Sequence, residues 1–561
     1  MGWQVANKWA RRYSNSVTVN VSSGMSDTKR GAVLVAAYAN AAALTPGGVA
    51  LSNGNRAVVM IPPGRYLMAS GLALASNYVD LVATAQSRMF DRPTQSAGAS
   101  CGGGSDTTHI TIEGVDATTI FPAGVWVCHS TEATWHKVTT SAYADETTTV
   151  TVSPAAASTF AGTAAYAYNK PMFGQTMLIR GSGGATLLQT AADVRLSGLT
   201  VVCTGSTSVA GATASDALRI NVSATGSNAA SIYSDSVFFC TVPTNAAVAG
   251  PEHSAPVWGE TDIAGTWYNC RTNNSAWRPK ANMVLSASMY DCHGANLCFG
   301  SDQSGASISG HLERCIGTAQ AFGGCTVYGC DISGTLIDCE GGDNSFAMGK
   351  AIKAGAVLKR CSSGAMSFGS YAGSGTDYGS VEATAILEDC VSTGNGGGNG
   401  GCFGQGHASC ALAGSLVRCR IGTVANYAAG TCGGTATTFT GSVSNCHPWR
   451  PTLCTGATTI RVFDNGQTYI ATKTNGSVTF TLPASIAGLT YTVVRGNASA
   501  GNDVIIDPSG SETIQIADGT VGGAGKYITN ASEETGSVTL TCHTAGAWIV
   551  THTQGTWSQE S

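Results

Sequence analysis

Few side chains in this sequence have the type and spacing needed for acid–base chemistry. Glu340 and Asp343 stand three residues apart, and Lys350 follows them. Glycoside hydrolysis uses two carboxyl groups about 5–9.5 Å apart, and sugar-cleaving lyases use a base such as Lys, His or Tyr. We therefore take Glu340 and Asp343 as the candidate catalytic pair. His293 with His311 is an alternative group, and solvated turn residues are the simplest interpretation of either.

Aromatic residues offer a second kind of chemistry, which is the binding of sugars. Sugar rings stack on exposed aromatic faces, and Tyr and Trp combine an apolar body with a polar group. The candidates for such contacts are Trp258, Trp277, Tyr290, Tyr371 and Tyr378. Several aromatic residues at these spacings must instead fill a core, so exposure decides between the two roles.

The sequence gives no reason to expect a cofactor or a metal ion. It contains neither a His-Glu-x-x-His nor a P-loop pattern, and no two of its 20 cysteines form a Cys-x-x-Cys pair. Those patterns supply the ligands of zinc and of nucleotide phosphates. We therefore predict that the protein uses no cofactor and no metal.

A repeated four-residue motif indicates which structural elements position these residues. Ten cysteines end a four-residue phrase that begins with an apolar residue, from Val237–Cys240 to Val443–Cys446. With Cys330 set aside, successive cysteines are 22 to 30 residues apart. Such a period indicates stacked repeats, and this Gly-rich unit is too short for two helices. The sequence predicts an all-β solenoid, a parallel β-helix with the cysteines inside it as thiols.

The residue before the repeated cysteine alternates in charge from coil to coil. In order it is Asp291, Arg314, Asp338, Arg360, Asp389 and Arg418. Residues at one register in neighbouring strands lie close enough to pair. We predict a ladder in which each Asp has an Arg above or below it, and in which Arg360 is shared by Asp338 and Asp389.

Composition excludes several classes of partner. Only 11% of the 561 residues are charged and the net charge is −5, which gives no basis for nucleic-acid binding. No apolar stretch reaches the roughly 18 residues of a membrane span, so we expect no membrane insertion. The first residues lack the apolar core of a secretion signal, so we expect no signal peptide.

The predicted organisation has three parts. Residues 1–45 form an N-terminal anchor and capping helix, in which Asp27 caps a helix that runs to Thr45. Residues 46–454 form the β-helix, interrupted by an inserted loop or hairpin from Trp126 to Tyr168. Residues 455–561 form a β-sandwich-like antiparallel module of seven short strands, many of them separated by Gly and Asn.

Two segments of the chain resemble known families. Asp27-Thr28 and Val59 to Tyr66 resemble the Ala-rich helix and the Val-x-Ile-Pro-Pro-Gly-x-Tyr strand that begin pectate-lyase-like β-helix proteins, among them many phage tailspikes. The C-terminal residues resemble modules of phage tail fibres; the matching positions are Phe480 to Pro483, Gly488 to Tyr491, Asn502 to Pro508, Glu512 to Ile514 and Ala547-Trp548. The first resemblance implies a right-handed parallel β-helix, and the second implies a virion protein.

Together the resemblances imply a phage tailspike or tail-fibre protein that attaches to host surface polysaccharide. They also imply a homotrimer in the virion tail, assembled in the host cytoplasm. Its N-terminal segment, with Trp3 and Trp9, is then expected to dock to other tail or baseplate proteins. One alternative is a polysaccharide lyase or glycoside hydrolase that works along the β-helix face. Another is a structural virion or surface-appendage protein without enzymatic activity.

Overall fold

The structure is a computed structural model in which most of the chain is described. The described residues are 15–85, 95–129, 134–161, 164–168, 176–180, 184–203, 216–222, 231–232, 238–241, 257–272, 276–294, 297–300, 305–324, 329–364, 367–369, 379–392, 403, 411–421, 438–439, 442–444, 452–462, 465–472, 476–496, 503–530 and 536–560. They fall into two compact units, Met1–Thr335 with Cys339–Gly341 and Leu336–Asp338 with Gly342–Ser561. The predicted anchor residues Trp3 and Trp9 lie outside the described residues.

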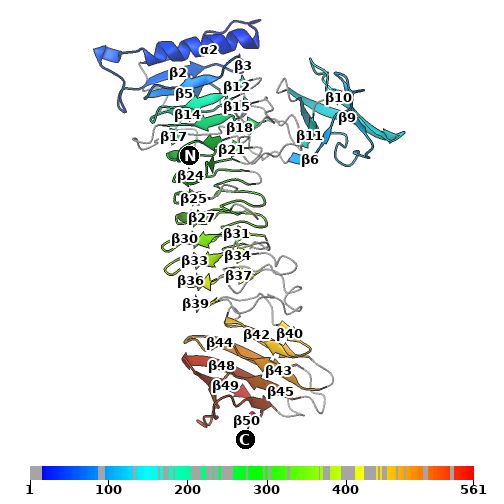
Figure 1. Ribbon diagram of the computed structural model, residues 1–561, viewed down its shortest axis with the longest axis vertical. Coiled ribbons are helices and arrows are strands. Elements are labelled where there is room, and N and C mark those ends of the chain that lie inside the picture. The colour runs from blue at the N-terminus through cyan, green and yellow to red at the C-terminus, as the bar shows by residue number, and fades with distance from the viewer. Residues whose placement is uncertain are drawn as a thin grey trace. The chain divides into compact units, whose positions relative to one another are not determined.

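One α-helix, α2 (Asp27–Ala42), packs on the first strands of the first unit (Figure 1). Its N-cap is Ser26, whose hydroxyl accepts from the Lys29 amide, so the predicted cap at Asp27 was one residue late. Asp27 instead accepts from the Arg65 guanidinium at 3.0 Å. The helix needs a glycine at Gly31, because a Cβ there would collide with the backbone of Leu67.

Successive coils of the first unit stack their strands in parallel. The first ladder is β1 (Ser16–Thr18), β2 (Ala57–Ile61), β5 (Val79–Ala83), β14 (Arg195–Ser197), β17 (Ser231–Ile232), β20 (Thr266–Tyr268), β24 (Ser288–Tyr290) and β26 (His311–Glu313). The second is β3 (Gly64–Met68), β12 (Thr176–Arg180), β15 (Thr200–Cys203), β18 (Phe238–Thr241) and β21 (Arg271–Thr272). The third is β4 (Leu72–Leu74), β13 (Leu187–Gln189), β16 (Leu218–Ile220), β19 (Val257–Gly259) and β22 (Arg278–Pro279). A shorter ladder joins β23 (Val284–Leu285), β25 (Ser307–Ile308) and β27 (Asp331–Ile332). The prediction of an all-β chain with parallel sheets is confirmed.

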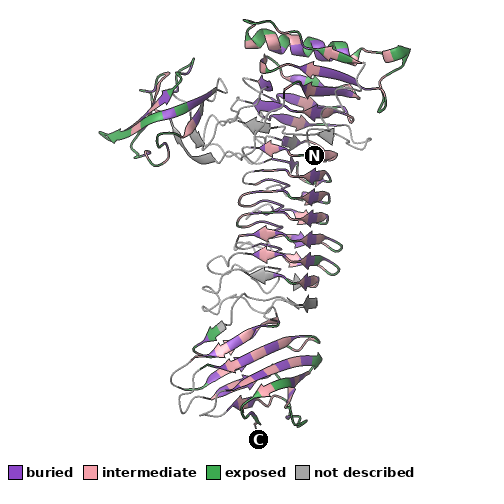
Figure 2. Ribbon diagram, turned by 180° about the vertical axis from the view of Figure 1, so that it is seen from behind, coloured by how far each residue is buried: buried purple, intermediate pink, exposed green. Residues whose placement is uncertain are grey.

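The strand period explains which residues face the core. In β20, β24 and β26 the central residues Trp267, Met289 and Leu312 are fully buried, and the residues on either side of each point outward. Figure 2 shows the same alternation of buried and less buried residues along the strands. The column cysteines that are described are buried thiols, as predicted: Cys270, Cys292, Cys315, Cys339, Cys361, Cys390 and Cys419.

An antiparallel sheet interrupts the coils of the first unit. Its strands are β6 (Gln95–Ser100), β7 (His109–Glu113), β8 (Trp126–His129), β9 (Thr134–Ala144), β10 (Thr147–Ser153) and β11 (Ala164–Tyr168). The inserted hairpin predicted from Trp126 to Tyr168 is therefore only part of a larger insert. The insert has its own core, centred on Ile110, Phe121 and Phe160.

The second unit repeats the parallel pattern. Its ladders are β28 (Thr335–Ile337), β30 (Val357–Lys359), β33 (Ile386–Glu388), β36 (Ser415–Val417) and β39 (Ser442–Ser444); β29 (Ala351–Ile352), β32 (Ser380–Val381), β35 (Ala411–Leu412) and β38 (Thr438–Phe439); and β31 (Ser362–Ser363), β34 (Val391–Ser392) and β37 (Arg420–Ile421). Inside these coils Phe346, Phe368 and Phe403 form a continuous stack with ring centroids 4.8 Å apart. Each of the three has a left-handed backbone, with φ between 53° and 59°.

The C-terminal sheets differ from the predicted antiparallel module. One contains β40 (Thr452–Cys454), β42 (Thr468–Ala471), β44 (Thr490–Arg495), β48 (Ser537–Thr544), β49 (Ala547–Gln554) and β46 (Thr513–Gln515). The other contains β41 (Thr458–Thr459), β43 (Val478–Thr481), β45 (Val504–Asp507), β47 (Ile528–Asn530) and β50 (Ser558–Gln559). Both sheets are mixed, because β40, β42 and β44 pair in parallel whereas β44, β48 and β49 pair antiparallel.

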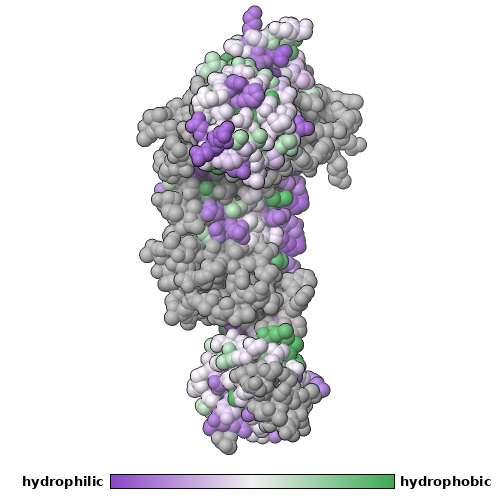
Figure 3. All heavy atoms as spheres, turned by 90° about the vertical axis from the view of Figure 1, so that its right-hand side faces the viewer, coloured by the Kyte–Doolittle hydropathy of each residue, from purple (hydrophilic) through white to green (hydrophobic). Residues whose placement is uncertain are grey.

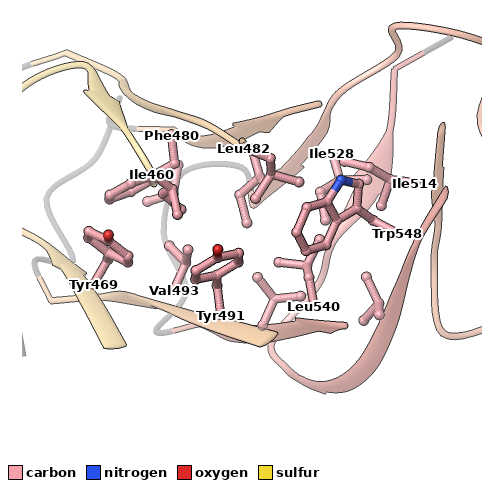
Figure 4. Packing of buried hydrophobic residues seen from close by; sticks show 14 of the residues in the cluster. Ile460, Tyr469, Phe480, Leu482, Tyr491, Val493, Ile514, Ile528, Leu540 and Trp548 are labelled. Carbon is pink, nitrogen blue, oxygen red and sulfur yellow. The ribbon is translucent and has the colours of Figure 1, made fainter. Parts of the chain in front are cut away.

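The residues after Cys454 have a hydrophobic core of their own. Tyr491 and Trp548 lie at its centre, fully buried, with ring centroids 5.6 Å apart (Figure 4). The Trp548 indole donates to the carboxylate of Glu512 at 3.0 Å, which satisfies its polar group. The domain boundaries at residues 45 and 454 stay predictions, because the compact units instead divide among the coils near Thr335 and Gly342.

Candidate functional site

An exposed row of aromatic side chains runs across three neighbouring strands of the first unit. We call Tyr268, Tyr290 and His311 the aromatic row; they point outward from β20, β24 and β26. The rings of Tyr268 and Tyr290 stack with centroids 5.0 Å apart, and His311 follows at 5.6 Å, tilted by 47°. Tyr268 is 37% exposed. The parallel register places Tyr268 opposite Tyr290, whereas His311 is the strand partner of Ser288 and lies diagonal to Tyr290.

Charged side chains border the aromatic row. Arg314 donates from Nε and Nη2 to the two carboxylate oxygens of Asp291, at 2.7 and 3.0 Å. Its Nη1 donates to Glu313. The other carboxylate oxygen of Glu313 lies 3.5 Å from His311 Nε2. The Asp291 carboxylate, more than any other group, raises the pKa of Arg314 above its ordinary value.

This arrangement can bind a polar chain and is poorly suited to cleaving one. Tyr268 is exposed and Tyr290 is half-buried, each carries a phenol that can donate or accept, and His311 adds a donor or acceptor. The carboxylates of Asp291 and Glu313 are engaged by Arg314 and His311, which leaves neither as an unoccupied acid or base. Figure 3 shows one face of the molecule, whose described surface is mostly hydrophilic or neutral.

The proposed catalytic pair is not assembled into a described site. Glu340 and Asp343 are both exposed, and Lys350 is half-buried. Glu340 pairs through its backbone with Ile316 at the end of a coil, whereas Asp343 belongs to the other compact unit. Their catalytic role therefore stays a prediction. In the alternative histidine group, His293 Nδ1 lies 3.2 Å from Arg271 Nη1, and His311 belongs to the aromatic row.

The glycan-binding candidates have different fates. Tyr290 is half-buried within the aromatic row, and its role in glycan binding stays a prediction. The prediction that Trp277 is an exposed platform was wrong, because its side chain is fully buried and stacks on Phe299 with ring centroids 4.8 Å apart. Trp258 lies on β19, and its side chain is outside the described residues. Tyr371 and Tyr378 also lie outside the described residues.

The charge ladder exists as separate pairs. Arg360 binds both carboxylate oxygens of Asp338, at 2.6 and 2.8 Å. Arg418, and not Arg360, donates hydrogen bonds to the two carboxylate oxygens of Asp389, at 2.7 and 2.8 Å. The prediction that Arg360 serves Asp338 and Asp389 alike was therefore wrong for hydrogen bonds, although the charge of Asp389 still acts on Arg360 from a longer distance.

The sequence did not point to a buried carboxylate on the third ladder. Asp216 is fully buried and receives the Arg219 Nε–H at 2.8 Å. Burial is the main cause that raises the pKa of Asp216 to about 6, and the charge of Glu260 adds to it. With no exposed surface, Asp216 has no access to a ligand. Its Asp-x-x-Arg spacing resembles any turn and carries no signal of its own.

No group of three or more metal-binding side chains is present among the described residues. Within the same residues, no helix is long and apolar enough to cross a membrane. The column thiols are held by the coil backbone: Cys315 Sγ, for example, donates to the carbonyl of Met289 at 3.6 Å. Burial keeps the pKa of Cys292, Cys315 and Cys390 well above the ordinary thiol range.

No protein-family model matches the chain, and no curated protein matches it either. Among solved structures it is similar to the Gp54 tailspike of Acinetobacter baumannii bacteriophage AP22, in complex with A. baumannii capsular saccharide, at 10% identity and a TM-score of 0.20. The match covers 79% of this chain and 63% of the tailspike, so the chain spans less than two thirds of that protein's length. At so low a TM-score the likeness carries no argument about fold or ligand.

Proposed function

We propose that this chain is the host-attachment protein of a phage tail, a tailspike or tail fibre that binds surface polysaccharide through the aromatic row. The observation that supports this most is the row itself. Tyr268 and Tyr290 stand at one register in neighbouring strands with ring centroids 5.0 Å apart, and His311 on the next strand lies 5.6 Å from Tyr290. A polymer of sugars is a repeating ligand, and a repeating surface meets it at several points.

The finer features of the proposal come from the two resemblances in the sequence. The coils form a right-handed parallel β-helix, and three chains assemble into a homotrimer in the virion tail after synthesis in the host cytoplasm. The N-terminal residues dock to other tail or baseplate proteins. A trimer presents the aromatic row three times, which raises avidity without any new contact. Neither nucleic acid nor membrane insertion has a part in this function.

Purified protein and a panel of bacterial strains test the proposal. The protein should bind cells of a susceptible strain, compete with phage particles and leave the length of the surface glycan unchanged. Tyr290→Ala should weaken binding about tenfold, since aromatic contacts are worth about 0.5–1.5 kcal/mol beyond their buried area. Tyr143→Ala is the matched control, because Tyr143 is 43% exposed but lies on the insert. Equal loss in both variants, or none in either, contradicts the proposal.

The same assay separates the two alternative functions. Shortening of the glycan supports a polysaccharide lyase or glycoside hydrolase, and Glu340→Gln and Asp343→Asn then test the candidate pair. A pair that acts together should abolish cleavage when either carboxylate is removed, while binding persists. Failure to bind any strain, with particles that still need the protein for assembly, supports a structural role.

A further inference from the structure

The charges beside the aromatic row are arranged so that they repel an anion. Asp291 directly follows Tyr290, and Glu313 is the strand partner of Tyr290 across β24 and β26. Both carboxylates are partly exposed, with side-chain exposures of 49% and 28%. An acidic ligand lying along the row therefore meets two negative groups at its border.

The cation in this cluster is already occupied. Arg314 uses Nε and Nη2 for Asp291 and Nη1 for Glu313, so a ligand carboxylate must displace a side chain to gain a forked pair. Two carboxylates and one guanidinium leave the cluster with one net negative charge while His311 is neutral.

We propose that the aromatic row selects glycans that carry no carboxylate group. This inference rests on the proposed function and names its ligand class: polymers of neutral sugars or amino sugars, with uronic and other acidic sugars disfavoured. Selection arises from repulsion, because Asp291 and Glu313 oppose an acid at this row, and Arg314, the cation described beside them, is already engaged by both. At surface distances such a repulsion corresponds to about a tenfold loss of affinity for an acidic polymer.

The same charges argue against β-elimination at this row. A lyase removes the proton beside a sugar carboxylate, and it needs a cation to neutralise that carboxylate as charge develops. Arg314 is held by Asp291 and Glu313 instead. Tyr290 and His311 are side chains of a suitable type for acid–base work, but they lack the neutralising group. Binding of an uncharged glycan is consistent with this arrangement.

The experiment uses the full chain and a glycan array grouped by carboxylate content. Bound glycans should belong mainly to the carboxylate-free group. The tightest-bound polymer is then compared before and after its primary hydroxyls are oxidised to carboxylates. Oxidation should weaken binding by about tenfold at low salt and by less at high salt. Equal or tighter binding of the oxidised polymer overturns the proposal.

A pair of variants tests whether charge is the cause. Asp291→Asn releases the Arg314 fork and should restore much of the affinity for the oxidised polymer. Asp389→Asn is the control, because it removes the equivalent carboxylate that Arg418 binds in the second unit. The residue before Asp389 is Glu388, whereas the residue before Asp291 is Tyr290, so the control site has no aromatic side chain at this position. Both positions have φ 54°, a left-handed conformation that Asn tolerates, so both variants should fold.

The outcomes separate this inference from the proposed function. A wild-type chain that binds no glycan of either group removes the proposed function and this inference with it. A chain that binds glycans, but shows the same oxidation ratio in wild type and Asp291→Asn, removes only the charge-based selection. Rescue by Asp389→Asn to the same extent as Asp291→Asn also overturns it, because the effect is then not local to the aromatic row.

Discussion

A single buried carboxylate makes stability depend on pH. Asp216 is fully buried beside Arg219, and burial raises its pKa to about 6 from 3.8. Because the folded pKa is raised, the folded state holds the proton more tightly than the unfolded chain does. The stability that this group contributes is therefore fully present below pH about 3.8 and is lost as pH rises through about 6.

Replacing this carboxylate should remove that part of the pH dependence. Asp216→Asn keeps the shape and one acceptor for Arg219 but has no charge to desolvate. At pH 7.5 it should gain up to about 3 kcal/mol in free energy of unfolding relative to wild type, and the gain should vanish near pH 4. Thermal melts of both proteins across this range measure the difference. A constant offset at every pH would show that Asp216 does not titrate as argued.

The exposed ion pairs should contribute much less. Arg418 bonds both Asp389 and Glu388, whereas the bonds of Arg360 described above go to Asp338. We expect Arg418→Ala to lower the melting temperature more than Arg360→Ala, with both changes small because the pairs are exposed. The difference should shrink in about 1 M salt, where surface charges are screened. A large loss in Arg360→Ala at high salt would point to packing and not to charge.

At the residue scale the sequence was informative about register and uninformative about exposure. The repeated motif aligns Tyr268 with Tyr290, because each stands two residues before a column cysteine. Tyr268 was not among the predicted candidates, although this alignment would have been sufficient to find it. Trp277 was misjudged because its left-handed backbone, φ 51°, turns it into the core, and no local pattern specifies that turn. Asp216 was missed because burial depends on distant coils.

At the element scale, the cysteine column gives a direct chemical test. The column thiols are buried and donate to carbonyls of the neighbouring coil, as Cys361 does to Leu336 at 3.5 Å. A native protein should therefore resist alkylation, since a thiol with a raised pKa is a poor nucleophile. Denatured without reductant, it should release at least the 13 thiols described, out of 20 cysteines. A number below 13 would mean that disulfides join some of these cysteines, seven of which belong to the column.

The C-terminal sheets should be more stable when their first strand is included. β40 (Thr452–Cys454) pairs in parallel with β42, and Cys454 belongs to the core that contains Tyr491 and Trp548. A fragment from residue 452 to 561 should show a cooperative melt, and one that starts at residue 456 should melt at a lower temperature. Circular dichroism and calorimetry compare the two. Identical melting would show that β40 adds nothing to this core.

The mixed pairing of these C-terminal sheets shows a limit of sequence reasoning. Short strands such as Val478–Thr481 and Val504–Asp507 have the same alternation of buried and half-buried residues whether the partner strand runs parallel or antiparallel. In the structure these two pair in parallel, whereas Val504–Asp507 pairs antiparallel with the next strand, Ile528–Asn530. Strand direction is set by the length and path of the connections, which local alternation does not encode.

At the scale of the whole molecule, the stacked coils were predictable because the same signal recurs along the chain. Each coil adds another apolar-x-x-Cys phrase, so an error in one repeat is corrected by the next. The insert had no such repetition to reveal it. Its six strands and separate core occur once, and only the end from Trp126 onward carried a visible pattern.

The path of the chain around that insert has a consequence for the coils on either side of it. β3 (Gly64–Met68) pairs in parallel with β12 (Thr176–Arg180) over five consecutive residues without a register shift, although the antiparallel sheet lies between them in the sequence. The pairing of these two strands therefore does not depend on the antiparallel sheet, and a chain with that insert removed between Ala83 and Thr176 is expected to keep the register of the neighbouring coils.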